Sequence, residues 1–386
     1  MIQVGIVGSG FAARLHLDAY RFVPGVSFRV ASICSKDATL PEFAREYEIE
    51  RVYTEYEEML RDAQIDVVDI ITPPRLHSAM ILQALAAGKH VICEKPLTGF
   101  CKPAFDEQGN PVSRSDMLAQ VNADLDAMEQ AMHASGKRIM YAENAVYASA
   151  VQKQAEFLRA RKSRVLLITG EQAHNGSQAA HAALWRENGG GALIRQGCHP
   201  LSAALYLKRV EGEARGEIIR PVAIMADVGV LARPLESAEH VYIESNPVDV
   251  EDWATICVEF SDGSRAQIWA GDMALGGVRN RMELFTGDGY YALNMAPNNM
   301  MDVYHPDERA LQDVYITEKV SNRAGWQHVL LEEAILRGYV GELTDFLRCA
   351  RDDYSAPQAD FTLARDCVQL IYAGYVAAER GVRVLL

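Results

Sequence analysis

The chain has 386 residues, 49% hydrophobic and 23% charged, which is typical of a globular protein of about two domains. Its formal net charge of −14, with no basic cluster to offset it, argues against nucleic acid or an anionic membrane as a partner. No apolar run approaches the roughly 18 residues of a membrane span, and the first residues carry no secretion signal. Seven scattered cysteines indicate reduced thiols, so we expect a cytoplasmic protein.

Short apolar runs alternate with helical patterns over the first 100 residues. Strands are predicted at 4–7, 28–33, 67–71 and 90–93, and helices at 12–20, 41–47 and 78–87. Nearly all-apolar strands separated by helices indicate a parallel sheet covered on both faces, and right-handed crossovers then produce a doubly wound, Rossmann-like α/β domain. A polar insertion at 99–115 precedes a helix at 117–135 and a strand at 137–142.

The pattern changes after about residue 150. Strands are predicted at 165–169, 222–231, 254–260, 264–270, 281–285 and 290–294, and helices at 150–160, 199–208, 329–352 and 361–380. Asp262-Gly263 separates two of these strands as the turn of a β-hairpin does, so antiparallel pairing is expected. We therefore predict a Rossmann domain over residues 1–146 and an α+β domain over residues 147–386.

A glycine-rich stretch, Gly8-Ser9-Gly10-Phe11-Ala12-Ala13, follows the first strand and opens the first helix. Glycines let the backbone approach a pyrophosphate, which the N–H groups of the helix N-terminus then hold. We therefore assign Gly8, Gly10, Phe11 and Ala12 to cofactor binding. A glycine-rich turn that binds nothing is the alternative.

The end of the second strand indicates which nicotinamide cofactor is used. NAD enzymes usually place an acid here for the ribose hydroxyls, whereas a nearby cation accommodates the phosphate of NADP. This chain has Ser35 and Lys36 at that point, and Asp37 comes slightly late, where it could simply cap a helix. We predict that Ser35 and Lys36 bind the cofactor and that NADP is favoured over NAD.

The third and fourth strands end in polar residues that face the predicted cofactor groove. They are Thr72, Pro73 and His77 after the third strand, and Glu94 and Lys95 after the fourth. A lysine beside an oxidised nicotinamide and away from bulk water can exchange protons near neutral pH. Taken alone, Lys95 could equally be a solvated loop lysine.

Together, these motifs resemble the Gfo/Idh/MocA family, which includes glucose–fructose oxidoreductase and inositol 2-dehydrogenase. The residues that carry the resemblance are Gly8 to Ala13, Thr72-Pro73 with His77, Glu94-Lys95-Pro96, and Gly189-Gly190-Gly191-Ala192-Leu193 followed by Gly197-Cys198-His199. The resemblance implies a second domain with a large, mostly antiparallel open sheet, a nicotinamide cofactor and a homo-oligomer, either a dimer or a tetramer. It also implies that Lys95 and His199 are catalytic.

The chain departs from the family pattern around His199. The family commonly has an aspartate four residues before this histidine and another acid three residues after it, where this chain has Arg195 and Ser202. If residues 195–199 are helical, Arg195 and His199 share a face. Arginine cannot act as a base, but it can clamp a carboxylate or phosphate of a substrate. It could equally form a salt bridge with an acid of the protein, and both interpretations stay open.

Further candidates for substrate binding are Asn144, Tyr147, His174 and Trp185, besides Arg195. His174, His181 and His199 match no compact ligand spacing, so we predict no metal site. Trp185 could equally be a packing residue.

We expect hydride transfer between NAD(P) and a secondary alcohol of a sugar, sugar acid or cyclitol. Lys95 takes the hydroxyl proton, and His199 hydrogen-bonds the reacting or a neighbouring oxygen. Two alternatives stay open. One is a lyase, isomerase or hydrolase that oxidises its substrate transiently with a tightly held cofactor, and the other is a non-catalytic, cofactor-dependent sensor.

Overall fold

The computed structural model describes residues 1–105, 109–177, 179–237, 242–296, 300–316, 318–320, 322–352, 354 and 356–386. Its N-terminal part is a six-stranded parallel sheet with the order β3-β2-β1-β4-β5-β6. The strands are β1 (Ile2–Val7), β2 (Phe28–Cys34), β3 (Arg51–Tyr53), β4 (Val67–Ile70), β5 (His90–Glu94) and β6 (Ile139–Ala142). The strand order runs outward from β1 in both directions, which confirms the predicted doubly wound fold.

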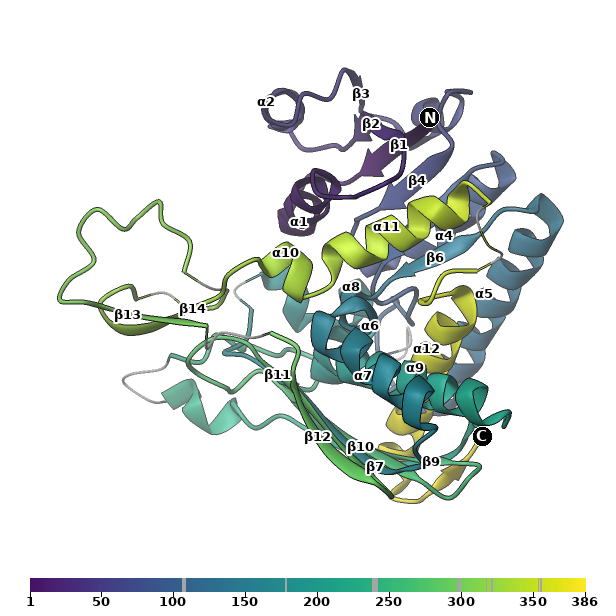
Figure 1. Ribbon diagram of the computed structural model, residues 1–386, viewed down its shortest axis with the longest axis vertical. Helices are drawn as coiled ribbons and strands as arrows, with labels where there is room; N and C mark the ends of the chain where they lie inside the picture. Colours follow the sequence, from purple (N-terminus) through teal and green to yellow (C-terminus); the bar gives the residue numbers. More distant parts are fainter. Residues whose placement is uncertain are drawn as a thin grey trace.

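Helices connect these strands and cover the sheet (Figure 1). They are α1 (Phe11–Tyr20), α2 (Leu40–Glu46), α3 (Tyr56–Leu60), α4 (His77–Ala86) and α5 (Arg114–Ser135), with a short 3-10 helix at Pro74–Leu76. Ser113 caps α5 by accepting a hydrogen bond from the backbone N–H of Asp116, and Gly136 ends the helix in the left-handed conformation. The sequence did not predict β3 and α3, and part of the polar insertion, residues 106–108, lies outside the described residues.

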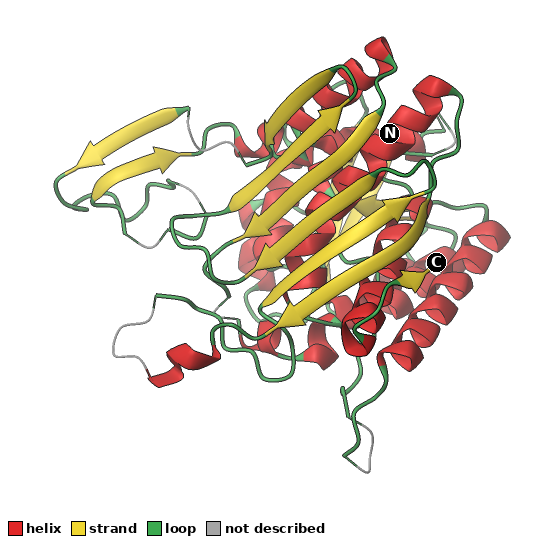
Figure 2. Ribbon diagram, turned by 90° about the horizontal axis from the view of Figure 1, so that it is seen from below, coloured by secondary structure: helices red, strands yellow, loops and turns green. Residues whose placement is uncertain are grey.

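The second sheet has seven strands in the order β12-β11-β7-β10-β9-β8-β15. They are β7 (Val165–Ala173), β8 (Pro221–Gly229), β9 (Trp253–Phe260), β10 (Arg265–Gly271), β11 (Arg279–Thr286), β12 (Gly289–Asn294) and β15 (Val384–Leu385). Only β7 and β10 pair in parallel, so the predicted large, mostly antiparallel sheet is confirmed. Figure 2 shows this sheet with helices behind it and its other face uncovered.

The remaining elements belong to neither of these two sheets. They are α6 (Asn144–Tyr147), α7 (Ser149–Arg161), α8 (Trp185–Asn188), the π-helix at Leu193–Gly197, α9 (Cys198–Arg215), β13 (Met301–His305), β14 (Gly325–Val329), α10 (Glu333–Leu336), α11 (Tyr339–Ala350) and α12 (Phe361–Arg380), with 3-10 helices at Ala180–Ala183 and Arg233–Ser237. The β13–β14 hairpin projects from the body of the molecule (Figure 1). Of the helices in the described part of the chain, none has the length and apolar character needed to span a membrane.

One predicted helix is interrupted. The helix expected at 329–352 is divided into α10 and α11 by Gly338, which has a φ of 98°. A Cβ on Gly338 would lie 2.3 Å from the carbonyl oxygen of Asn144, so the chain needs glycine for this close approach. The break directs α11 onto α1 of the first domain (Figure 1).

The C-terminal helix joins the two sheets. α12 packs against α5 and β6 on one side and against α9 and β8 on the other. Arg365 of α12 pairs with Glu129 of α5 at 2.7 Å. The hydroxyl of Tyr372 donates to the carbonyl of Gly189 at 2.5 Å and accepts from the backbone N–H of Phe100 at 2.6 Å. These contacts fix the two sheets relative to each other.

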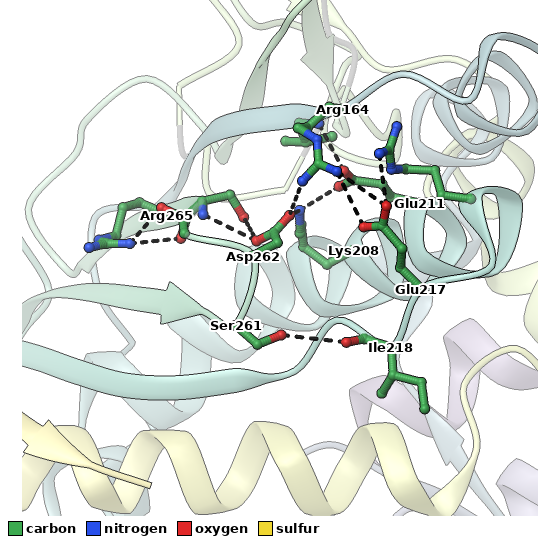
Figure 3. A network of polar contacts seen from close by, with 12 residues as sticks. Arg164, Lys208, Glu211, Glu217, Ile218, Ser261, Asp262 and Arg265 are labelled. Atoms are coloured by element: carbon green, nitrogen blue, oxygen red, sulfur yellow. Dashed lines mark hydrogen bonds and ion pairs between the residues drawn. The ribbon is translucent and has the colours of Figure 1, made fainter.

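A buried ionic network anchors α9 to the second sheet (Figure 3). Lys208 is 1% exposed, and its Nζ contacts Glu211 and, at 2.9 Å, Asp262 in the turn between β9 and β10. Arg164 pairs with Glu217 at 3.2 Å on the same side. Because breaking a buried pair leaves an uncompensated charge, such a network fixes the position of the helix.

We predict different effects for alanine at the two glycines of the first turn. Gly8 has a φ of 119°, and a Cβ there would lie 2.4 Å from the carbonyl oxygen of Ile71, whereas a Cβ on Gly10 would meet no atom within 4 Å. Gly8→Ala should therefore lower the free energy of unfolding by about 2 kcal/mol or more, and Gly10→Ala by less than about 1 kcal/mol. Urea unfolding of both variants without cofactor measures this difference. Equal losses would show that the Ile71 carbonyl moves aside freely.

Candidate active site

A cleft of about 430 Å³ lies where the carboxyl ends of the parallel strands meet the second sheet. Ligands of open α/β sheets bind outside these ends, where the strand order reverses, and the reversal here falls between β1 and β4. Of the predicted site residues, the cleft is lined by Phe11, Ala12, Thr72, Glu94, Lys95, Asn144, His174, Arg195 and His199. Both predicted domains thus contribute to one site.

The glycine-rich turn fits a dinucleotide pyrophosphate. α1 begins after Gly10, and no side chain caps its first N–H groups. Because a Cβ on Gly10 would meet only open space, an anion can approach the backbone there. The Oγ of Ser9 donates to the Oγ of Ser35 at 2.9 Å, which ties the turn to the end of β2. The turn therefore offers the uncapped helix end that phosphate oxygens need.

Ser35 and Lys36 lie at the end of β2, where this fold places the adenosine ribose. The Nζ of Lys36 pairs with the Oε2 of Glu55 at 3.4 Å, and both side chains are largely exposed. Asp37 accepts from the backbone N–H and the hydroxyl of Thr39, each at 2.9 Å, and these hydrogen bonds lower the pKa of Asp37. The strand end thus offers a hydroxyl and a cation, with Glu55 as a competing partner for the cation.

A buried ionic triad lies beneath the strand ends of the cleft. His16 of α1 contacts the Oδ2 of Asp69 at 2.9 Å and the Oε1 of Glu94 at 3.2 Å. Burial lowers the pKa of His16, but the two carboxylates outweigh it and raise this pKa well above its usual value. The hydroxyl of Tyr20 also donates to Asp69, at 2.9 Å. The other oxygen of Glu94 accepts from the backbone N–H of Lys95 at 2.9 Å, so the triad holds the lysine's backbone in place.

Lys95 and His199 both line the cleft, the first directly after β5 and the second in α9. The Nζ of Lys95 donates to the carbonyl of Arg195 at 2.8 Å. The Nδ1 of His199 lies 2.5 Å from the Oε1 of Glu143, which is fully buried. Burial lowers the pKa of His199, and the charge of Lys95 lowers it further against the opposing effect of Glu143. Glu143 was not predicted from the sequence, although it directly follows the predicted strand at 137–142.

Arg195 has a partner within the protein. Its guanidinium pairs with the carboxylate of Asp272, which follows β10, and the amide of Gln196 donates to the other oxygen of Asp272. Burial raises the pKa of Asp272, and the charge of Arg195 opposes this rise. Arg195 lies in a π-helix that continues directly into α9, so residues 195–199 are helical, and both Arg195 and His199 line the cleft.

The triple glycine has a packing role in this structure. A Cβ on Gly191 would lie 1.8 Å from the carbonyl oxygen of Glu251, so only glycine fits there. The buried carboxylate of Glu251 accepts from the N–H groups of Gly191 at 3.0 Å and Leu193 at 2.9 Å, and from the hydroxyl of Tyr375 at 2.8 Å. These bonds fix the start of the π-helix, and with it Arg195.

His174 and Asn144 occupy the cleft wall with partners of their own. The Nδ1 of His174 accepts from the N–H of Gly176 at 3.0 Å, and burial lowers the pKa of His174 to about 3. The amide of Asn144 donates to the carbonyl of Arg337 at 2.8 Å. Lining residues that were not predicted include Gln172, Asn188, Glu318, Lys319 and Tyr339. No motif in the sequence indicated that these five residues would line the cleft.

Three predicted residues lie behind the cleft rather than in its wall. The hydroxyl of Tyr147 donates to Asp345 at 2.6 Å in the contact with α11. Trp185 is 1% exposed and packs against Tyr375. The ring nitrogens of buried His77 contact the carbonyls of Pro96 and Thr72, each at 2.8 Å, so this ring braces two loops of the cofactor groove.

Glu143, Cys198 and His199 bring potential ligand atoms within 4.8 Å of one another. Zinc ligands lie about 2.0–2.3 Å from the metal, and tetrahedral geometry then separates neighbouring ligand atoms by roughly 3 Å or more. The 2.5 Å between Glu143 and His199 is shorter than this separation. These two atoms are therefore hydrogen-bonded in this arrangement.

Comparison with known proteins identifies two matching family models. One, described as an oxidoreductase family with an NAD-binding Rossmann fold, matches residues 2–107. The other, described as a GFO/IDH/MocA C-terminal domain, matches residues 163–292. The matches cover the glycine turn, Lys95 and His199.

Relatives and solved structures extend over most of the chain. Levoglucosan dehydrogenase of Pseudarthrobacter phenanthrenivorans is 25% identical over 342 residues, with 81% of this chain and 80% of the relative covered. GenD2 from gentamicin A biosynthesis, solved in complex with NAD, superimposes with a TM-score of 0.79 at 22% identity, covering 100% of this chain and 96% of the other. Myo-inositol 2-dehydrogenase from Lactobacillus plantarum gives a TM-score of 0.72 at 16% identity, with coverages of 100% and 99%. The two superpositions show the same fold.

We predict that removing Arg195 destabilises the protein in a pH-dependent way. Arg195→Ala leaves the carboxylate of Asp272 buried without its cation, which should cost about 3 kcal/mol near neutral pH. Because the folded-state pKa of Asp272 then lies further above the unfolded value, the loss is small at about pH 4 and grows as the pH rises. Thermal unfolding from about pH 4 to about pH 8 measures it. Adding Asp272→Asn should recover most of the loss, and a loss that persists at every pH would contradict the prediction.

Proposed function

Because the chain belongs to the Gfo/Idh/MocA oxidoreductase family, we propose that it transfers hydride between NAD(P) and a secondary alcohol of a sugar, sugar acid or cyclitol. The observation that carries the proposal is the convergence of Lys95 and His199 in one cleft beside an uncapped helix N-terminus. The sugar and cyclitol dehydrogenases among its relatives and structural neighbours support this substrate class.

The chain's own residues account for binding and proton transfer. Gly8, Gly10 and the first N–H groups of α1 would hold the pyrophosphate, and the nicotinamide supplies the hydride acceptor when bound. As the carbinol C–H bond breaks, Lys95 takes the proton of the same hydroxyl, so the alcohol becomes a carbonyl. The carbonyl of Arg195 orients the Nζ of Lys95 for this step, and His199 hydrogen-bonds the reacting or a neighbouring oxygen.

The preference for NADP over NAD is part of this proposal and rests on Ser35 and Lys36. The ion pair between Lys36 and Glu55 competes with a cofactor phosphate for the same cation. Exposed pairs of this kind contribute little, whereas a phosphate presents more charge and more acceptor oxygens to the lysine. The pair is therefore a weak barrier to phosphate binding.

We also propose that the protein forms a homo-oligomer, a dimer or a tetramer. Apolar and aromatic side chains lie exposed on strands of the open sheet, at Leu166, Met225, Phe285 and Tyr290. Exposed apolar surface on a sheet that helices cover from one side is typical of an interface.

The first test of this function removes Lys95. Lys95→Ala should lower kcat by about 10²–10⁴-fold because general acid–base catalysis is worth that much, while cofactor affinity changes little. Turnover is measured by nicotinamide absorbance over a panel of polyols and sugar acids, and cofactor binding by calorimetry. Lys102→Ala, an exposed lysine outside the cleft lining, is the matched control. Wild-type turnover in Lys95→Ala would remove Lys95 from the mechanism.

The cofactor preference is tested at the end of β2. Lys36→Asp should weaken NADP binding about ten- to hundredfold, because it replaces attraction to the phosphate by repulsion, and should change NAD binding much less. Glu55→Gln frees Lys36 and should strengthen NADP binding by no more than about fivefold. Titration of both cofactors by fluorescence gives the affinities. Equal losses for NAD and NADP in Lys36→Asp would show that Lys36 does not contact the phosphate.

A further inference from the structure

His199 takes its carboxylate partner from outside its own helix. The family pattern places an acid four residues before this histidine, and that position is Arg195 here. The carboxylate comes instead from Glu143, between β6 and α6, whose Oε1 lies 2.5 Å from the Nδ1 of His199. The same oxygen accepts from the N–H of Ala145 at 3.3 Å, so it also caps α6. The carboxylate has no exposed surface and is held from two sides.

We propose that Glu143 is a positioning residue that keeps the proton of His199 on Nδ1 and leaves Nε2 as the hydrogen-bond acceptor for a substrate hydroxyl. This inference rests on the proposed function, because it assumes an alcohol in the cleft. Glu143 thereby joins the site, and His199 accepts the hydrogen bond that the substrate hydroxyl donates.

The geometry defines the tautomer. An ionised carboxylate only accepts hydrogen bonds, so the proton between Glu143 and His199 belongs to Nδ1. A neutral imidazole has one N–H, and Nε2 is then a bare acceptor. The ring lines the cleft, and no hydrogen bond to Nε2 comes from the part of the chain that the structure describes. Nε2 is therefore left for a ligand.

Burial, together with two nearby cations, lowers the pKa of the His199 ring. The groups that act on it are Lys95, Glu94, Glu143, His174 and Arg337. Burial lowers the pKa of His199, and Lys95 and Arg337 lower it further, while Glu143 raises it. Since the net direction is downward, Nε2 accepts at neutral pH and becomes a donor only in acid.

The bare Nε2 determines which substrate hydroxyl His199 can bind. The one proton of the reacting hydroxyl goes to Lys95, so the hydroxyl that donates to Nε2 is a neighbouring one. This hydrogen bond holds the substrate while Lys95 takes the proton of the reacting oxygen. Glu143 thus acts through His199, in the place of the acid that the family carries at position 195.

The test uses the cofactor-loaded enzyme without substrate. ¹⁵N-histidine NMR reports which ring nitrogen of His199 is protonated, and the missing signal in His199→Asn assigns the resonance. We expect the Nδ1–H tautomer at neutral pH in the wild type. Glu143→Gln should lower the pKa of His199 by about one unit or more, because an adjacent carboxylate shifts a pKa by that amount. Glu342→Gln is the matched control, since Glu342 is also a buried glutamate, and burial raises its pKa well above the usual value.

Steady-state kinetics complete the test, with a polyol that the enzyme oxidises as the substrate. In Glu143→Gln, kcat/KM should fall about ten- to hundredfold and its acidic limb should move to lower pH, while Glu143→Asp keeps the carboxylate and should recover part of the loss. An Nε2–H tautomer in the wild type, or a His199 pKa unchanged in both Glu143 variants, overturns the inference even if alcohols are oxidised. The Nδ1–H tautomer with a Glu143-dependent pKa, but without oxidation of any alcohol, would instead count against the proposed function.

Discussion

Three basic side chains in the cleft and beneath it are paired with carboxylates, because burying an unpaired charge is costly. The carboxylates come from distant parts of the chain: Asp69 for His16, Asp272 for Arg195, and Glu143 for His199. Every such pair joins two elements, so the cleft is held in shape by the same charges that give it chemistry. The site forms only when both sheets are folded and docked.

The docking of the two sheets depends on close backbone approaches as well as on charge. Gly191 allows its chain to reach Glu251, and Gly338 allows α11 to reach the start of α6. The Nζ of Lys95 and the carbonyl of Arg195 then meet across the cleft. A bulkier residue at either glycine would separate elements that hold Lys95 and His199 together.

The different charge states of the histidines in the site follow from the charged groups around each ring. The pKa of His16 is raised by two carboxylates, whereas those of His174 and His199 are lowered by burial and by nearby cations. One histidine is therefore a structural cation at neutral pH, and the other two are neutral hydrogen-bonding groups. Three histidines of one small region thus serve different purposes, and their surroundings make the difference.

The sequence by itself determined the parallel sheet, the glycine turn and the position of Lys95 after β5, because apolar strand runs and turn residues are local signals. It also identified His199 through its motif. Only the tertiary structure supplied the partners: Asp272 lies 77 residues from Arg195, and Glu143 lies 56 residues from His199. It likewise placed Tyr147 and Trp185 behind the cleft. Which carboxylate meets which base is decided by how the two sheets pack, and no local pattern in the sequence encodes that contact.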